Sequence, residues 1–278
     1  MSTHFLSEIL AQKRKLMAPR PSEASGFRER ALELRRNVAR HRLLQALESE
    51  SARLKIIAEF KRRSPSSGII RDDLAADEVA RRYERGGACA ISVLTDEQYF
   101  GGSIADIGAV RSSTDLPVLR KDFIIDPVQI YEAAIVGADA VLLIVAVLDD
   151  ASLGRLRGLA EDDLGLDALV EVHTSDELRR AVRAGAKIIG VNNRDLKTFR
   201  VSLNTSERLI AEAPADIIMI SESGLNGAES LRHLRALGFR GFLIGEALMR
   251  ASDPETALRD LIAAAEDRQV ARTGARRS

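Results

Sequence analysis

Residues 57 to 66 read Ile57-Ala58-Glu59-Phe60-Lys61-Arg62-Arg63-Ser64-Pro65-Ser66. The apolar run that starts at Leu54 and ends at Ala58 is typical of a buried β-strand. Glu59 and Lys61 follow it, and in an extended chain they point to the same side. A carboxylate buried there is costly unless it meets an opposite charge or a ligand. The hydroxyl and backbone N–H groups from Ser64 onward suit an anion, although an ion-paired strand end followed by an ordinary turn explains the stretch equally well.

Seven further short runs of β-forming residues follow this first strand, and helical patterns separate them. Asp126-Pro127 and Asp253-Pro254 mark two helix starts, because each pair places a capping residue before a proline of the first turn. Strands that alternate with helices indicate a parallel sheet, and near-continuous apolar strands indicate burial on both faces. The eight expected strands are Leu54–Phe60, Cys89–Leu94, Pro117–Lys121, Asp139–Val145, Ala168–Val172, Lys187–Val191, Asp216–Ser221 and Gly241–Ile244.

A weak internal repeat supports this count. A Gly-Ala pair precedes a strand at Gly87, Gly137 and Gly185, and Gly238-Phe239 is a fourth, poorer copy, so that the intervals are 48 to 53 residues. Each glycine fits the position just past a helix end, where a left-handed backbone is needed. Four such units, each with two strands and two helices, predict an α/β fold of the (β/α)8 barrel type.

The first 53 residues differ from the rest of the chain. Two amphipathic helical patterns, His4 to Met17 and Phe27 to Leu47, flank a break at Pro19-Arg20-Pro21. Lys and Arg outnumber Glu here by 11 to 6, but the two signs are interleaved. We therefore expect solvated helix faces and apolar stripes that pack on the barrel, rather than an arm that binds nucleic acid. The expected domains are a helical extension over 1–53, a catalytic barrel over 54–266 and a disordered basic tail over 267–278.

The composition narrows the possible partners. The 278 residues include 41 Lys and Arg and 41 Asp and Glu, so the net charge gives no reason to expect nucleic acid or an anionic membrane as a partner. The single cysteine, Cys89, cannot build a disulfide framework or a thiolate metal cluster. The longest apolar run, Ala140 to Leu148, is too short to cross a bilayer, and the N-terminus does not resemble a signal peptide. These features predict a cytoplasmic protein, and none of them indicates an obligate protein partner.

Charged residues gather at the ends of the odd-numbered strands. Strands one, three, five and seven end in Glu59, Lys121, Glu171 and Glu222. These ends form the active site of a parallel barrel, and alternate strands contribute to the same interior layer, so we expect the four side chains to converge. Lysine among glutamates in an apolar mouth is typical of acid–base catalysis, with Lys121 and Glu171 as the first pair and Glu59 and Lys61 as the second. The alternative is a ring of ion pairs that only closes the barrel.

The segments after strands seven and eight are the usual phosphate site of such barrels. Ser223-Gly224 and Gly245-Glu246 lie there, and the run from Glu246 to Arg250 is expected to form the short extra helix that holds an anion at its N-terminus. Glycine is also common in any tight turn from strand to helix. A carboxylate beside a phosphate is unusual, so we expect the side chain of Glu246 to point away.

No metal or cofactor motif is evident in the sequence. His4, His41 and His233 lie on helical patterns and form no cluster with the carboxylates, and His173 shares a strand face with Glu171, where a supporting role is expected. The Gly101-Gly102 pair lacks the spacing of a dinucleotide-binding motif. We therefore expect neither a metal nor an organic cofactor.

Five motifs, in this order, resemble those of the indole-3-glycerol-phosphate synthase family, and the similarity extends from the N-terminal helices to about Leu261. They are Ala58-Glu-Phe-Lys-Arg-Arg-Ser-Pro-Ser66, Leu119-Arg-Lys-Asp-Phe-Ile124, Val170-Glu-Val-His173, Gly190-Val-Asn-Asn-Arg-Asp-Leu196 and Ser221-Glu-Ser-Gly224. This family consists of (β/α)8 barrels with an N-terminal helical extension that act in tryptophan biosynthesis without a cofactor. The resemblance implies that 1-(2-carboxyphenylamino)-1-deoxyribulose 5-phosphate is converted to indole-3-glycerol phosphate with loss of carbon dioxide and water.

The resemblance also implies a role for each site residue. Lys121 is similar to the general acid that protonates the substrate carbonyl oxygen during ring closure, and Glu171 to the general base. Glu59 and Lys61 would assist proton transfer and hold the substrate carboxylate. The binding positions fall on Asn192, Arg194, Glu222 and Ser223 for the substrate, on Phe100 and Phe123 for the apolar walls around the anthranilate ring, and on Ser64, Gly224, Gly245 and Glu246 for the phosphate. Some relatives carry serine or another small residue at the position of Glu246. With glutamate at this position, the phosphate contact rests on the backbone N–H alone.

Two other functions remain open at this point. One is a different phosphosugar barrel, either an isomerase or an aldolase that forms a Schiff base at Lys121 or Lys61. The other is a barrel that binds a phosphosugar without turning it over.

Overall fold

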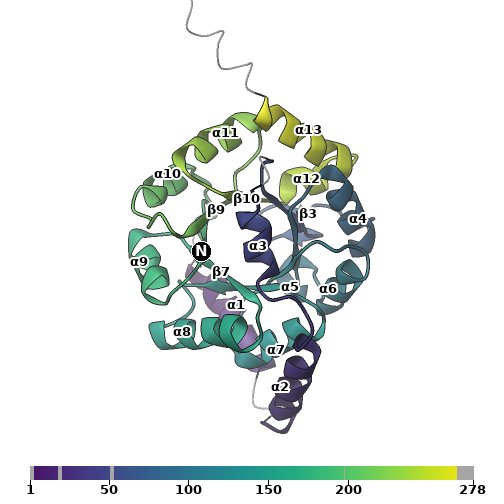
Figure 1. Ribbon diagram of the computed structural model, residues 1–278, viewed down its shortest axis with the longest axis vertical. Coiled ribbons are helices and arrows are strands. Elements are labelled where there is room, and N and C mark those ends of the chain that lie inside the picture. The colour runs from purple at the N-terminus through teal and green to yellow at the C-terminus, as the bar shows by residue number, and fades with distance from the viewer. Residues whose placement is uncertain (1–2, 18–20, 51–52, 197, 268–278) are drawn as a thin grey trace, which may run out of the picture.

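The computed structural model describes residues 3–17, 21–50, 53–196 and 198–267. Eight parallel strands close into a central barrel, and helices surround it (Figure 1). Every expected strand is present, and its ends lie within two residues of the prediction, so the (β/α)8 fold is confirmed. The barrel strands are β1 (Ile56–Phe60), β4 (Ala90–Leu94), β5 (Val118–Lys121), β6 (Ala140–Ile144), β7 (Asp167–Val172), β8 (Ile188–Asn192), β9 (Ile218–Glu222) and β10 (Gly241–Ile244).

The barrel has two apolar cores because its strands are buried on both faces. Each strand pairs in parallel with its neighbours in chain order, and β10 closes the ring against β1, with Ile57 opposite Leu243. One face of the strands fills the interior, where Ile57, Leu119 and Leu169 are fully buried. The other face packs against the surrounding helices, which explains why the strands read as near-continuous apolar runs.

The helices outside the barrel follow the repeat seen in the sequence. Gly87, Gly137, Gly185 and Gly238 all follow helix ends in the left-handed conformation, with φ of 96°, 90°, 80° and 116°. The longer helices that surround the barrel are α4 (Ala76–Gly86), α6 (Ile104–Arg111), α7 (Pro127–Ile135), α8 (Asp150–Gly158), α9 (Ser175–Arg183), α10 (Asn204–Ile210), α11 (Ala228–Leu237) and α13 (Pro254–Glu266). Three shorter segments are α5 (Glu97–Phe100), α12 (Glu246–Arg250) and the π-helical turn η1 (Leu159–Asp163) that continues α8.

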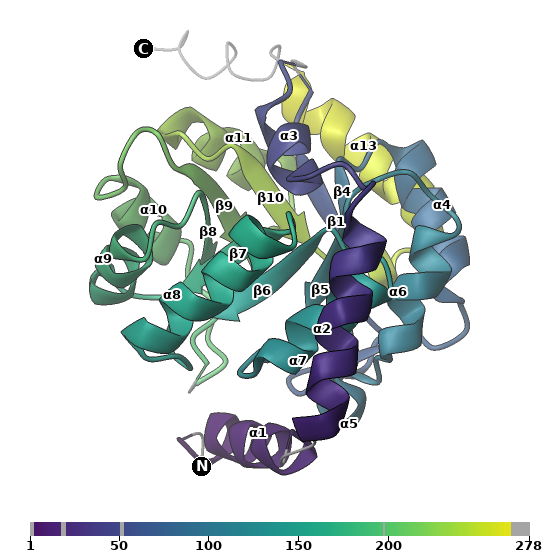
Figure 2. The same ribbon diagram turned by 60° about the horizontal axis from the view of Figure 1, so that its bottom comes forward.

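In the described part of the N-terminal segment, three helices precede the barrel, where the sequence suggested two. They are α1 (Thr3–Leu16), α2 (Pro21–Arg35) and α3 (Arg42–Glu48). The expected single helix from Phe27 to Leu47 is wrong, because the chain leaves helical geometry after Arg35 and His41 takes a left-handed conformation with φ of 55°. This turn lets Leu43 and Leu47 of α3 enter the interior core of the barrel. Figure 2 shows α1 and α3 at opposite ends of the barrel, with α2 between them along the outside.

Buried charges attach this extension to the end of the barrel where the strands begin. Asp139, which is 1% exposed, lies just before β6 and receives three guanidinium groups. Its distances are 2.9 Å to Arg42, 3.0 Å to Arg111 and 3.8 Å to Arg35. Arg35 also donates to the carbonyl oxygen of Leu164. The interpretation of the basic residues in this segment as solvated is therefore wrong for Arg35, which is buried because a carboxylate and carbonyl oxygens satisfy its donors.

A small hairpin follows β1 where the sequence suggested only a turn. Its strands β2 (Arg63–Ser64) and β3 (Gly68–Ile69) pair in antiparallel fashion, and the N–H of Ser67 donates to the carbonyl oxygen of Ser64 at 3.3 Å. The hairpin holds a group of serine hydroxyls over the end of the barrel where the strands terminate.

Among the described residues, no helix is both long enough and apolar enough to cross a membrane. The expectation of a disordered basic tail concerns residues 267–278, of which all but Asp267 lie outside the described residues.

Replacing Gly137 by alanine tests the repeat. Its φ of 90° is unfavourable for an L-residue, and an added Cβ would lie 2.8 Å from Cγ of Arg111. We expect Gly137→Ala to lower the free energy of unfolding by about 1–2 kcal/mol, measured by urea denaturation. Gly154→Ala is the matched control, since Gly154 lies within α8 and a Cβ there meets nothing within 4 Å. That variant should be neutral or slightly stabilising, and equal effects of the two would contradict this explanation.

Candidate active site

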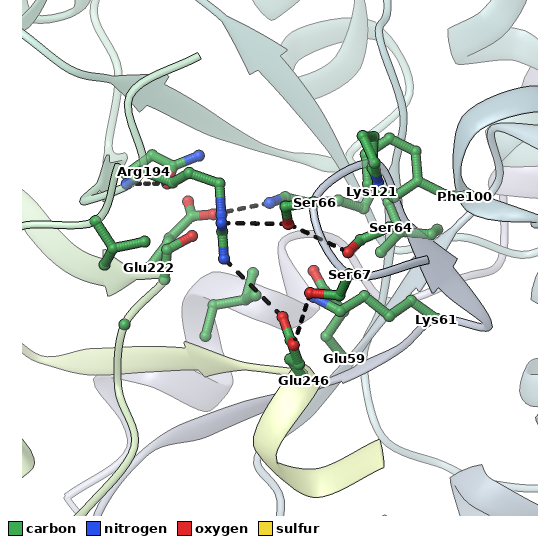
Figure 3. Close-up of a pocket in the computed structure, with 18 of the residues that line it drawn as sticks. Glu59, Lys61, Ser64, Ser66, Ser67, Phe100, Lys121, Arg194, Glu222 and Glu246 are labelled. Carbon is green, nitrogen blue, oxygen red and sulfur yellow. Dashed lines mark hydrogen bonds and ion pairs between the residues drawn. The ribbon is translucent and has the colours of Figure 1, made fainter. Parts of the chain in front are cut away.

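A cavity of about 650 Å³ opens at the ends of the barrel strands. Figure 3 shows Glu59, Lys61, Lys121 and Glu222 around it, together with the serines of the hairpin. The structure brings all the residues that the sequence placed at the site to this one cavity. They are Glu59, Lys61, Ser64, Phe100, Lys121, Phe123, Glu171, Asn192, Arg194, Glu222, Ser223, Gly224, Gly245 and Glu246.

Lys121 lies at the centre of the charged group. Its Nζ donates to Oε2 of Glu222 at 2.8 Å and lies 3.5 Å from Oε2 of Glu171. These three side chains come from β5, β9 and β7, which are alternate strands of the barrel, so their ends lie in the same layer. Glu222 is 1% exposed, and the barrel interior shields the whole group from bulk water.

Burial and charge act in opposite directions on these groups. Burial lowers the pKa of Lys121, but the carboxylates of Glu222, Glu171 and Glu59 outweigh it and raise this pKa above its ordinary value. Burial raises the pKa of Glu222 to about 7, because the charge of Lys121 compensates for it only in part. The Lys121–Glu222 pair therefore holds a lysine that keeps its proton and a carboxyl group that titrates close to neutral pH.

Glu59 and Lys61 form a second ion pair, with 2.7 Å between Nζ of Lys61 and Oε1 of Glu59. Burial raises the pKa of Glu59, but Lys61 and Lys121 outweigh it, so that its pKa is lowered and the group is ionised. Gly245 makes room for this carboxylate, because a Cβ at that position would lie 2.3 Å from Oε1 of Glu59. The glycine after β10 is therefore required by close packing and not by a left-handed backbone, since its φ is −127°.

His173 supports the site from one side. Its Nδ1 lies 3.3 Å from Oε2 of Glu177, and its Nε2 lies 3.5 Å from Oε1 of Glu171. Burial lowers the pKa of His173, but the hydrogen bond to Glu177 and the charge of Glu171 outweigh it and raise the pKa. Glu171 thus lies between the Lys121 ammonium group and the His173 imidazole.

A lysine of α1 also reaches the site, and sequence reasoning missed it. Nζ of Lys13 lies 3.0 Å from Asp96 and 2.7 Å from Asp122, and Lys13 is only 7% exposed. The two aspartates order the apolar walls. Asp96 caps α5, which ends in Phe100, and Asp122 accepts the N–H of Phe123 at 2.8 Å.

A signal for Lys13 does exist in the sequence. It lies four residues after Ile9, so the two side chains share one face of α1, and Ile9 is fully buried. A lysine on the buried stripe of a helix needs an acidic partner, and Asp122 next to Lys121 is one. Because Lys13 is buried, the expectation that the basic residues of this segment are solvated is also wrong for Lys13.

The opposite side of the cavity carries hydroxyl and guanidinium groups. Ser64, Ser66 and Ser67 come from the hairpin, and Arg194 comes from the loop after β8 (Figure 3). Arg194 donates to Oγ of Ser66 at 3.3 Å. The sequence indicates that the serine hydroxyls from Ser64 onward suit an anion, but it gives no site role to Arg250, which ends the expected short helix and also lines the cavity.

The side chain of Glu246 does not point away from this cradle, contrary to expectation. Its Oε1 accepts from Oγ of Ser67 at 2.9 Å and from Nε of Arg250 at 3.0 Å. The expectation assumed a bound phosphate. The hydroxyl of Ser67 and the guanidinium group of Arg250 hydrogen-bond the carboxylate, and this attraction holds it in the cradle.

No group of three or more His, Cys, Asp or Glu side chains that could hold a metal ion occurs in the part of the chain that the structure describes. The expectation that no cofactor is needed remains a prediction, which the assay described below tests.

The fold and this cavity define a (β/α)8-barrel enzyme whose ionisable groups suit acid–base chemistry on an anionic small molecule. The model of the indole-3-glycerol phosphate synthase family matches residues 6–261. The indole-3-glycerol phosphate synthase of Carboxydothermus hydrogenoformans is 49% identical over 80% of this chain and 84% of its own. That of Chloroherpeton thalassium is 48% identical over 88% of this chain and 94% of its own. The chain belongs to the indole-3-glycerol phosphate synthase family.

Solved structures of other enzymes share the fold alone. The 3-hexulose-6-phosphate synthase of Salmonella typhimurium superimposes with a TM-score of 0.61 at 16% identity, over 76% of this chain and 98% of its own. A thiamine phosphate pyrophosphorylase from Pyrococcus furiosus superimposes with a TM-score of 0.59 at 20% identity, over 77% of this chain and 96% of its own.

Replacing Lys13 tests the link between α1 and the cavity. Lys13→Met leaves two buried carboxylates without their shared cation, so we expect the free energy of unfolding to fall by about 3 kcal/mol. The segments that carry Phe100 and Phe123 should loosen, which should raise KM more than it lowers kcat. Urea denaturation and steady-state kinetics measure both effects. Lys15→Met, on the exposed side of the same helix, is the control, and a Lys13 variant that behaved like it would refute the link.

Replacing Glu222 tests the charge coupling at the centre of the site. Below about pH 7 Glu222 is protonated, and above it the carboxylate supports the charge of Lys121. In Glu222→Gln the ionisation near pH 7 should disappear from the pH profile of kcat/KM. The alkaline limb should move to lower pH, because Lys121 loses the largest charge that raises its pKa. Glu229→Gln, at an exposed site on α11, should leave the profile unchanged, and a retained ionisation near pH 7 in Glu222→Gln would assign it to another group.

Proposed function

We propose that this chain converts 1-(2-carboxyphenylamino)-1-deoxyribulose 5-phosphate to indole-3-glycerol phosphate by proton transfers from Lys121 and to Glu171. A carbon–carbon bond forms between the aromatic ring and the substrate carbonyl carbon, the bond to the carboxylate breaks, and water leaves. The carboxylate departs as neutral carbon dioxide, so each turnover takes up one proton. The observation that carries the proposal is the position of Lys121 between Glu222 and Glu171, 2.8 Å and 3.5 Å away.

Lys121 is the general acid in this proposal. Ring closure places negative charge on the carbonyl oxygen, and a positioned proton donor stabilises that charge as it develops. The hydrogen bond to Glu222 fixes the position of Nζ, and the carboxylates around it keep the proton on the lysine until the substrate arrives. The carboxylate of Asp122, the neighbouring residue, is paired with Lys13 and Arg120, so the general-acid role is assigned to Lys121.

Glu171 is the general base that removes the proton released when the indole ring becomes aromatic. It lies 3.5 Å from Nζ of Lys121, and the His173 imidazole lies 3.5 Å from its other oxygen. Glu59 and Lys61 assist proton transfer, and the Lys61 ammonium group holds the substrate carboxylate until it leaves. Their 2.7 Å ion pair keeps Lys61 directed into the cavity.

The remaining residues bind and orient the substrate. Phe100 and Phe123 form apolar walls for the anthranilate ring, and Lys13 stabilises the segments that carry them. Asn192, Arg194, Glu222 and Ser223 contact the substrate in the proposal, and Ser64, Gly224, Gly245 and the backbone of Glu246 receive the phosphate. The side-chain amide oxygen of Asn192 accepts the N–H of Arg194 at 3.0 Å, which fixes the start of that loop.

The direct test is to incubate the purified chain, dialysed against EDTA, with the carboxyphenylamino-deoxyribulose phosphate and to follow indole fluorescence. The background is low because the chain contains no tryptophan. Product formation without added metal supports both the reaction and the expectation of no cofactor. Binding without turnover would favour a non-catalytic barrel, and trapping of a lysine by borohydride would favour a Schiff-base aldolase.

Lys121→Met tests the assignment of the general acid. Methionine keeps the apolar stem but removes the proton and the charge, so turnover should fall by about a hundredfold or more. Substrate binding should weaken only modestly, because the phosphate is held on the other side of the cavity. Lys187→Met, at an exposed position, should behave as the unmodified chain. A rise in KM at constant kcat would instead make Lys121 a binding charge and move the acid role to Lys61.

A further inference from the structure

Glu246 connects three parts of the phosphate side of the cavity. Its Oε1 accepts hydrogen bonds from Ser67 of the hairpin at 2.9 Å and from Arg250 of α12 at 3.0 Å. Its Oε2 lies 4.0 Å from Nη2 of Arg194, in the loop after β8. Figure 3 shows the carboxylate between Ser67 and Arg194.

The donors around Glu246 are those that a phosphate group uses. Serine hydroxyls and arginine guanidinium groups hydrogen-bond carboxylate and phosphate oxygens alike. Burial raises the pKa of Glu246, but Ser67, Arg250 and Lys61 outweigh it, so that its pKa is lowered and the group is an anion at neutral pH. Two anions cannot share these donors without mutual repulsion, which is strong at short range and poorly screened in a partly enclosed cavity.

We propose that Glu246 is a built-in competitor of the substrate phosphate, which holds Ser67, Arg194 and Arg250 in the free enzyme and gives them up when phosphate binds. The inference rests on the proposed function for the nature of its ligand, a phosphate monoester. Glu246 then lowers the affinity for the phosphate group below what the donors alone would provide. It also favours product release, because its carboxylate recovers the donors as the phosphate leaves.

The test uses inorganic phosphate as the probe and titration calorimetry on the full chain. In Glu246→Gln the shape is kept and the charge is lost, so phosphate should bind about five- to thirtyfold more tightly than to the unmodified chain. Glu246→Asp keeps the charge and should not show this gain. Glu255→Gln is the matched control, since Glu255 pairs with Arg259 four residues on, as Glu246 pairs with Arg250, but lies outside the cavity.

A double variant locates the effect. Ser67→Ala combined with Glu246→Gln should lose most of the gain, because the freed hydroxyl is one of the donors that phosphate acquires. If Glu246→Gln binds phosphate equally or more weakly while its thermal unfolding is unchanged, the competitor role is wrong and Glu246 only holds Ser67 and Arg250 in place. The same conclusion follows if neither the unmodified chain nor this variant binds phosphate.

The experiment separates this inference from the proposed reaction because it needs no turnover. Tighter phosphate binding in Glu246→Gln by a chain that does not form indole product would support the competitor role and refute the reaction. Normal turnover with no change in phosphate affinity would do the reverse.

Discussion

The ion pairing of Lys121 inside the barrel is the interaction on which the rest of the site depends. An ammonium group and two carboxylates, those of Glu222 and Glu171, lie inside the barrel, where their contact with bulk water is small. Each charge alone would be too costly to bury, and only their mutual attraction offsets the loss of hydration. The same burial raises the pKa of Glu222 to about 7, so the arrangement that keeps the charges together also makes them responsive to protons near neutral pH. The ion pairs that make burial of these three side chains possible therefore also set the pKa values on which acid–base chemistry would depend.

The barrel and its extension make this cluster possible by supplying space and fixed positions. Alternate strands bring the three charged side chains to one level, and glycines provide room for the carboxylates of Glu222 and Glu59. A Cβ at Gly190 would lie 2.0 Å from Oε1 of Glu222, and one at Gly245 would lie 2.3 Å from Oε1 of Glu59. At the rim, Lys13 neutralises two aspartates that would otherwise repel each other, and so fixes the backbone of the apolar walls. The N-terminal helix thus acts on the cavity through charge as well as through apolar packing.

The two sides of the cavity treat anions in opposite ways. At the reacting side, carboxylates surround a lysine and keep it protonated. At the proposed phosphate side, donors surround a carboxylate, that of Glu246. A site that must both bind a phosphorylated substrate and release a phosphorylated product gains from such an internal anion, because affinity for the shared phosphate group slows release as much as it strengthens binding.

The order of strands and helices, the barrel closure and the position of the site follow from the sequence, because they depend on local patterns: apolar runs, glycine just past each helix end, and charges at strand ends. The same patterns could not reveal the break after Arg35, the burial of Lys13 or the inward direction of Glu246. Each of these depends on a partner far away in the chain. His41 donates its N–H to Gly165, Lys13 meets Asp96 and Asp122, and Glu246 meets Ser67 across 179 positions. Local sequence determines what each segment can form, whereas only the closed barrel determines which charges become neighbours, because the free energy of a buried charge depends on the groups that surround it in space.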